Sequence, residues 1–145
     1  MAQFLILKFN FHDEFSGSTW STASALSTSV SLTAGAGTKS DGSIFGGDTG
    51  GWSSPSAITQ EWNGSSWSAG GVLSTARHGL TGGGSGTSDM LAVAGYTGSN
   101  ISSTEEYNGT SWSAGANLTV GLSGLTSAGA GQTDEGWFTG GYNGS

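Results

Sequence analysis

Apolar residues occur along this chain in short, strand-sized runs, which are separated by glycine, serine, asparagine and aspartate. Runs of this kind between turn-forming residues are typical of β-strands. The single proline, Pro55, falls in a predicted loop and interrupts none of the runs, as expected because proline cannot donate to a sheet. The pattern predicts an all-β fold.

The pattern also repeats. The segment 61–70 (EWNGSSWSAG) matches the segment 106–115 (EYNGTSWSAG), and a looser copy (EFSGSTWS) occupies residues 14–21. The offsets between the three copies are 47 and 45 residues. Self-similarity at a nearly constant period of this size is typical of propellers and other repeat architectures. We therefore interpret residues 1–145 as one domain of three tandem units.

Each unit divides into four pieces. They are a strand of leucine and small residues, an apolar strand that closes on small residues, a strand with glutamate and an aromatic residue, and a Ser-Trp-Ser strand. Asn63-Gly64 and Asn108-Gly109 separate the third and fourth pieces, and Asn-Gly favours a type I′ hairpin turn with φ > 0 at both central residues. Four such pieces predict one antiparallel sheet per unit.

Two units are continuous, at approximately 26–70 and 73–115. The third unit is divided between the ends of the chain. Residues 9–22 carry only a third and a fourth piece, whereas residues 122–142 carry only a first and a second piece. The end segments are therefore complementary halves of one unit.

The order of the pieces resembles the Kelch motif, which has a diglycine after its second strand, a tyrosine in its third and a tryptophan in its fourth. The matching positions are Gly46-Gly47, Trp62 and Trp67, then Ala94-Gly95, Tyr107 and Trp112, then Gly140-Gly141, with Phe15 and Trp20 beginning the series. The departures are Ala94 in place of the first glycine, and Phe15 and Trp62 in place of tyrosine.

The Kelch resemblance implies β-propeller blades of four antiparallel strands. Small residues in the first strand suit the crowded centre of such a ring, and the tryptophans of the fourth strand suit the wider spaces between outer strands. The Ser/Thr/Gly-rich form of the repeat is also similar to repeats in phage and marine-microbe structural proteins.

The number of units predicts an assembly. Propellers have about four to eight blades, and this chain has three. Two chains that paired their complementary ends twice would close a six-bladed ring without free strand edges, so we predict a homodimer with C2 symmetry. Three alternatives remain open: a fragment of a longer chain, a partner that is another propeller or virion protein, and closure of three blades within one chain.

Composition narrows the classes of partner. The chain has 28 glycines but also six tryptophans, and disordered low-complexity chains have few aromatic residues. Its net charge is −7 with three basic residues, which argues against nucleic acid and against an anionic membrane surface as partners.

Cysteine is absent, so disulfide and thiol chemistry are excluded. The apolar start, residues 1–8, is too short to span a membrane, and we recognise no signal peptide there.

Acidic side chains recur in the turn between the first and second pieces, at Asp41, Asp89 and Asp134. A ring of carboxylates at one face could hold Ca²⁺, which prefers several oxygen ligands. The other interpretation is solvated turn residues, because aspartate commonly forms turns. We expect no other cofactor.

Glutamate recurs in the third piece, where paired carboxylates would suit glycoside hydrolysis. A residue present in every unit is better explained by the needs of the unit itself, so we predict no catalytic residue. Arg77 and His78 lie between units and are interpreted as structural. A galactose oxidase-like activity needs a cysteine-modified tyrosine, which a chain without cysteine cannot form.

The loop after the second piece is the predicted ligand-binding surface, because it differs between units at a shared position. Trp52 and Tyr96 could stack on sugar rings, with Asp48 and Asn100 as hydrogen-bond partners. Both aromatic residues could equally pack against their own sheet.

The sequence therefore predicts a non-enzymatic structural or adhesion module of a virion, such as a tail fibre, or of an extracellular assembly. A carbohydrate-binding lectin is the alternative, and a glycan-acting enzyme is a third reading.

Overall fold

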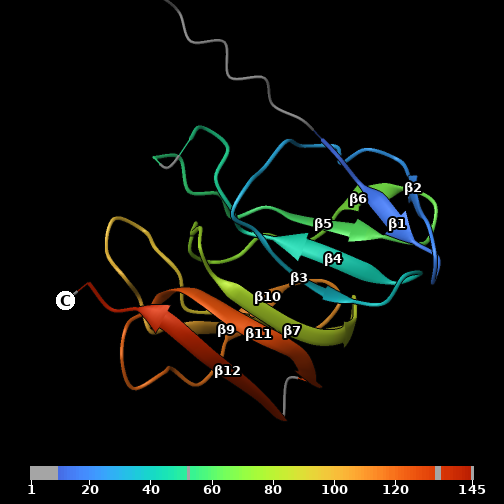
Figure 1. Ribbon diagram of the computed structural model, residues 1–145. Helices are drawn as coiled ribbons and strands as arrows, with labels where there is room; N and C mark the ends of the chain where they lie inside the picture. The colour runs from blue at the N-terminus through green and yellow to red at the C-terminus, as the bar shows by residue number, and fades with distance from the viewer. Residues whose placement is uncertain (1–9, 52, 133–134, 145) are drawn as a thin grey trace, which may run out of the picture.

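The computed structural model describes residues 10–51, 53–132 and 135–144, with only the backbone described for 126–132 and 135. In these residues the fold is all-β, as predicted, with antiparallel sheets of two or four strands and no helix. Figure 1 shows the sheets lying one beside the other in a row.

Two four-stranded sheets form the centre of the molecule, and each follows the order of the sequence. The first contains β3 (Ala34–Gly37), β4 (Gly42–Phe45), β5 (Thr59–Trp62) and β6 (Trp67–Ala69). The second contains β7 (Thr81–Gly86), β8 (Asp89–Val93), β9 (Thr104–Tyr107) and β10 (Trp112–Ala114). These sheets lie within the two continuous units of the sequence.

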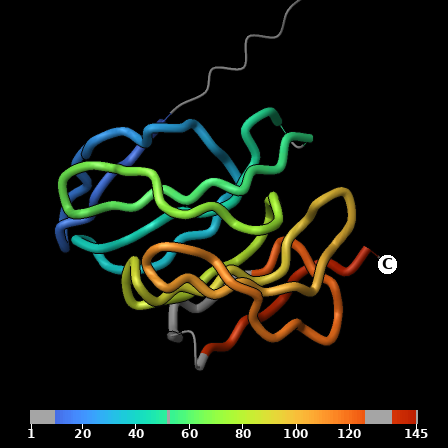
Figure 2. The backbone as a smooth tube through the Cα atoms, turned by 180° about the vertical axis from the view of Figure 1, so that it is seen from behind, coloured from blue at the N-terminus to red at the C-terminus, as the bar shows by residue number. Residues whose placement is uncertain are grey.

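A two-stranded hairpin lies at each end of the chain. The N-terminal hairpin joins β1 (Asp13–Phe15) to β2 (Trp20–Thr22), and the C-terminal hairpin joins β11 (Ser123–Gln132) to β12 (Glu135–Tyr142). The two hairpins belong to separate sheets, at opposite ends of the row in both Figure 1 and Figure 2.

The first strands of successive sheets lie against each other, β3 beside β7 and β7 beside β11. Their small residues make this approach feasible. A Cβ atom added to Gly82 in β7 would collide with the ring of Phe45 and lie 3.2 Å from the Cβ of Ala34 in β3. The glycine-rich first strands therefore set the spacing of the sheets.

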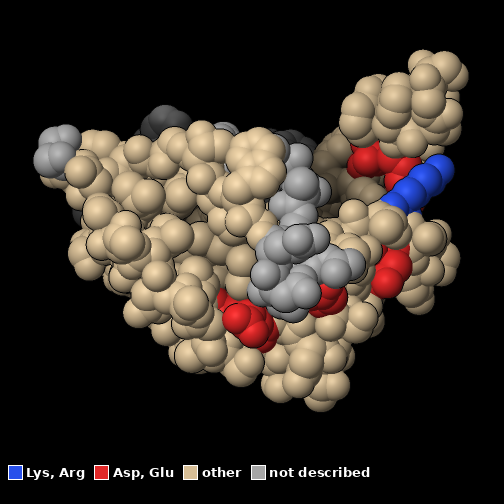
Figure 3. Space-filling model, turned by 90° about the horizontal axis from the view of Figure 1, so that it is seen from below, with Lys and Arg blue, Asp and Glu red and all other residues tan. Residues whose placement is uncertain are grey.

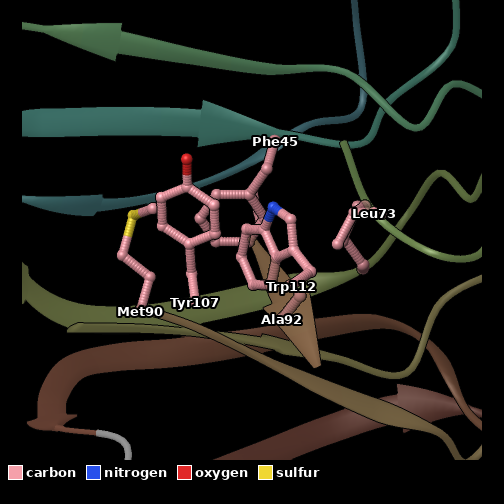
Figure 4. Packing of buried hydrophobic residues seen from close by; sticks show 8 residues of the cluster. Phe45, Leu73, Met90, Ala92, Tyr107 and Trp112 are labelled. Carbon is pink, nitrogen blue, oxygen red and sulfur yellow. The ribbon is translucent and has the colours of Figure 1, made fainter. Parts of the chain in front are cut away.

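The hydrophobic core lies between the two four-stranded sheets. Figure 4 shows Phe45 from the first sheet directed toward Met90, Tyr107 and Trp112 from the second. The indole N–H of Trp112 donates to the hydroxyl of Thr59 (2.9 Å) across this boundary. Burial of large aromatic side chains supplies most of the energy that holds two such sheets together.

The Asn-Gly turns close the predicted hairpins, but with a different turn type. Positive φ occurs at Gly64 and Gly109 (both 90°) and not at the preceding asparagines. Instead the side-chain oxygen of Asn63 accepts hydrogen bonds from the backbone N–H groups of Ser65 and Ser66, both at 3.0 Å. The type I′ prediction was therefore wrong. The asparagine does not adopt a left-handed backbone conformation, and its side chain closes the turn through hydrogen bonds.

Candidate functional site

The predicted ligand-binding loop after β4 is held by its own aspartate. Asp48 is 2% exposed, and its carboxylate accepts hydrogen bonds from the backbone N–H groups of Gly50 (2.8 Å) and Ser54 (2.9 Å). This geometry leaves the carboxylate little surface for a ligand, because its oxygens order the loop. Trp52, the other residue predicted there, lies outside the described residues.

The corresponding loop after β8 is more open. Tyr96 is 37% exposed, and its ring lies 5.4 Å from that of His78. Asn100 donates its side-chain N–H to the backbone oxygen of Tyr142 (2.8 Å), while its buried side-chain oxygen receives no hydrogen bond from the described residues. Tyr96 and Asn100 thus lie in one loop, close to each other.

These residues line an open hollow of about 570 Å³, the Tyr96 hollow, together with Val120 and Tyr142. Sequence reasoning missed Tyr142. The repeat itself contained the signal, because Tyr142 follows Gly140-Gly141 as Tyr96 follows Ala94-Gly95.

The predicted calcium ligands are engaged separately. The Asp41 carboxylate accepts the backbone N–H of Thr87 (3.1 Å) in the next sheet, and that of Asp89 lies 3.4 Å from the hydroxyl of Ser85. Asp134 lies outside the described residues. Within the described part of the chain, no three histidine, cysteine or acidic side chains cluster as a metal ion would need.

The third-strand glutamates support the sheets. The carboxylate of Glu61 accepts the hydroxyl of Tyr107 (2.7 Å) across the boundary between the two central sheets, and the backbone N–H of Gly71 donates to the same hydroxyl (2.9 Å). Burial, together with the hydrogen bond to Glu61, raises the pKa of Tyr107 above its ordinary value. Tyr107 therefore stays a neutral donor.

A buried ion pair joins the linker before β7 to β9. Arg77 is fully buried and donates to the carboxylate of Glu105, which is 2% exposed. Arg77 also donates to the backbone oxygens of Ala94 (3.2 Å) and Ser103 (2.9 Å). Burial lowers the pKa of Arg77, and the nearby charge of Glu105 opposes that shift. The interpretation of Arg77 as structural agrees with these contacts.

In the first central sheet a neutral side chain, Gln60, anchors the preceding linker. Gln60 stands where the second sheet has Glu105, and it accepts hydrogen bonds from the Ser27 hydroxyl (2.6 Å) and the backbone N–H of Thr28 (3.0 Å). In the second sheet the backbone N–H of Ser74 donates to Glu105 (2.7 Å) in the corresponding way. The two side chains therefore share one task, which is to anchor the linker that precedes each sheet.

A second concavity, which sequence reasoning missed, separates the N-terminal hairpin from the first central sheet. This His12 groove has a volume of about 410 Å³ and lies between β1 on one side and β3 and β4 on the other, with Phe15, Ala36 and Ile44 among its lining residues. Figure 3 shows this side of the molecule hollowed, with acidic side chains and a basic one at the rim.

Aromatic packing positions the hairpin beside the groove. The ring of His12 lies 4.5 Å from that of Trp62 and 5.2 Å from that of Trp67, both edge-on. Trp67 donates its indole N–H to Nδ1 of His12 (3.3 Å), and Lys39 forms an ion pair with Glu14 at the rim (3.5 Å). His12 thus serves as a spacer between the hairpin and the sheet.

The described part of the chain contains no helix long and apolar enough to cross a membrane. Comparison with family models and with curated protein sequences finds no match for the chain. The Kelch resemblance consequently stays a hypothesis that rests on the residues themselves.

Proposed function

We propose that the sheets are blades of a Kelch-like β-propeller, and that the chain is a non-enzymatic structural or adhesion module of a virion or an extracellular assembly. Two features support the propeller. Successive sheets meet through their first strands, and a fourth-strand tryptophan of one sheet packs against the preceding sheet, as Trp112 does at Thr59. Both features are what radial packing of blades requires.

The observation that carries the functional proposal is the use of two third-strand glutamates, Glu61 and Glu105. Glu61 binds Tyr107, and Glu105 binds Arg77 and the backbone of Ser74. A general acid or base must reach the substrate, whereas these two carboxylates hold one segment of the protein to another. Glu61 and Glu105 are therefore explained by the stacking of the sheets and the anchoring of a linker.

Two experiments test the proposal. One measures the abundance of the protein in its native context, and the other measures the activity of the isolated protein on glycans. In particles or surface material purified from the source, quantitative mass spectrometry should find the chain in a fixed ratio to the main structural protein. The isolated protein should release no sugar from a panel of glycans. Sugar release that disappears in Glu106→Gln would overturn the proposal in favour of a glycan-acting enzyme.

Carbohydrate binding is the second candidate, and the Tyr96 hollow favours it. The hollow places two exposed aromatic rings, Tyr96 and Tyr142, beside the amide of Asn100. Aromatic faces with a few polar groups are the usual features of small-ligand sites. A glycan array should then give a defined set of binders, lost in Tyr96→Ala and kept in Val72→Ala, which removes an exposed apolar side chain away from the hollow. An array without binders would exclude this candidate.

A further inference from the structure

The terminal hairpins repeat the backbone pattern of the central sheets, strand by strand. The N–H of Ala23 donates to the oxygen of His12 (2.8 Å), as Gly70 donates to Thr59 and Gly115 to Thr104 (both 3.0 Å). The N-terminal hairpin is therefore built as a third and a fourth strand. The C-terminal hairpin ends in Gly140-Gly141 with positive φ (76° and 99°), as β4 ends before Gly46-Gly47 (66° and 99°), so it is built as a first and a second strand.

Each hairpin consequently lacks the neighbour that the central sheets possess. In those sheets the second strand pairs with the third, β4 with β5 and β8 with β9. Among the described strands, β12 of the C-terminal hairpin pairs with β11 alone, and β1 of the N-terminal hairpin pairs with β2 alone. Each hairpin therefore has one strand edge, of β1 or of β12, that faces no other strand among the described residues, and such edges bind other strands.

We propose that a second copy of this chain supplies the missing strands, with β12 of each copy pairing antiparallel to β1 of the other and the C-terminal hairpin seated in the His12 groove. The proposal rests on the propeller arrangement proposed above and names its partner. Pairing within one chain is disfavoured, because β1 and β12 lie at opposite ends of the row of sheets (Figures 1 and 2).

The His12 groove is the place where another first and second strand belong. Among the described strands, β7 has a first strand on each side, β3 and β11, whereas β3 has a first strand, β7, on one side alone. In agreement, Gly35 and Gly37 of β3 are exposed, whereas Gly82 and Gly83 of β7 are buried. The groove opens beside the uncovered face of β3 and is bounded on its far side by β1, so a hairpin that entered it would meet both.

The central sheets also give the register. Met90 pairs with Tyr107 and Leu91 with Glu106, and the repeat places Gly136 and Trp137 at the β8 positions and Phe15 and Glu14 at the β9 positions.

Trp137 of one copy therefore lies opposite Glu14 of the other. Hydrogen bonds of β1 to β2 involve His12 and Ser16, so the alternation of antiparallel pairing directs the backbone groups of Asp13 and Phe15 toward the open edge. The edge of β1 is therefore ready to receive β12.

The fourth-strand tryptophans show what closure would bury. Trp112 is 8% exposed because it packs on the sheet before its own, and Trp67 is half-buried against His12. Trp20 has the same repeat position but is 70% exposed, because no described sheet lies against it. In the proposed ring, Trp20 lies against Thr104 of the second copy, as Trp112 lies against Thr59.

Disulfide cross-linking tests the register directly, because the chain contains no cysteine. The double variant Glu14→Cys with Trp137→Cys places the two thiols opposite each other, at a non-hydrogen-bonded pair with about 4.5 Å between Cα atoms, which a disulfide can span. Mild oxidation should give a covalent dimer on non-reducing gels. The matched control, Glu14→Cys with Phe138→Cys, directs the thiols to opposite faces and should stay uncross-linked.

Other products would overturn the proposal. A disulfide within one chain would show that the three units close on themselves, and equal cross-linking in the control would contradict the register. Light scattering after size exclusion should give twice the chain mass of 14.4 kDa. A mass of one chain would refute the second copy, and masses that grow with concentration would indicate an open head-to-tail polymer.

The variant Trp20→Ala distinguishes an effect on dimerisation from an effect on the folding of one chain. Because the side chain is exposed within one chain, its removal should leave the circular dichroism spectrum unchanged while it weakens dimerisation by about tenfold or more, as loss of a central interface tryptophan commonly does. Unchanged dimerisation would overturn the inference. None of these results depends on the particle and glycan experiments. The dimer can therefore be refuted while the proposed function stands, and the proposed function can be refuted while the dimer stands.

Discussion

Replacing the Arg77–Glu105 pair by the neutral arrangement of the other central sheet tests how the chain anchors its linkers. Val30 and Gln60 hold the positions in the first unit that Arg77 and Glu105 hold in the second. The variants are Arg77→Val, Glu105→Gln and the double variant, which copies the first unit.

The expected loss of stability follows from the burial of the Arg77 and Glu105 side chains. Arg77→Val leaves the Glu105 carboxylate buried, with the N–H of Ser74 as its remaining hydrogen-bond donor, and removes the donor to the backbone oxygen of Ser103. Breaking a buried pair in this way costs about 3–5 kcal/mol. Glu105→Gln leaves a buried cation and should lose a similar amount. The double variant removes both charges together and should lose less than either single variant.

The assay is urea unfolding followed by tryptophan fluorescence, at one protein concentration for all four proteins, because association would add to the apparent stability. For a chain of this length, the single variants should also lower the melting temperature by roughly 10–15 °C. Losses below about 1 kcal/mol in the single variants, or a double variant that loses the sum of both, would refute the reasoning, since only coupled groups deviate from additivity.

Three further predictions follow from the packing. Gly82→Ala should lower the free energy of unfolding by about 1–3 kcal/mol, because the added Cβ would collide with the ring of Phe45. The control Gly35→Ala should lower the free energy of unfolding by clearly less. Equal urea midpoints for the two variants would contradict this prediction. Trp112→Ala should lose about 3–5 kcal/mol from the core, checked by thermal melts. Stability should fall as pH rises above about 10, because the unfolded tyrosine ionises before the folded Tyr107, whose pKa is raised; Tyr107→Phe should flatten this slope in urea midpoints measured at successive pH values.

Much of the fold was predictable because the repeat appears in the sequence three times. Comparing copies identified the strands of the central sheets and the clustering of small residues in their first strands, such as Gly82. The turn type at Asn63 was not predictable from the dipeptide alone, because side-chain and backbone solutions for closing a turn compete and differ little in energy. Local pattern thus indicates where a turn occurs better than how it is built.

The candidate site was less predictable, because its properties depend on three-dimensional contacts. Asp48 and Asn100 have similar polar side chains in corresponding loops, yet one is buried as a loop clamp and the other lines a hollow. The His12 groove was missed because its two walls come from segments that only folding brings together. Alignment of the units could have found Tyr142, whereas burial of Asp48 required the structure.

The meander order of the central sheets has a consequence for folding. Each four-stranded sheet is one unbroken stretch of chain, so most of its pairing joins neighbours in sequence, a topology that favours rapid folding. The terminal strands differ, because in the proposed dimer the neighbours of β1 and β12 come from the second copy. Native-state hydrogen exchange should therefore divide the molecule into slowly exchanging central strands and terminal hairpins that exchange quickly. If the proposed dimer forms, the hairpins should become protected as protein concentration rises, and the last step of folding would be a bimolecular one.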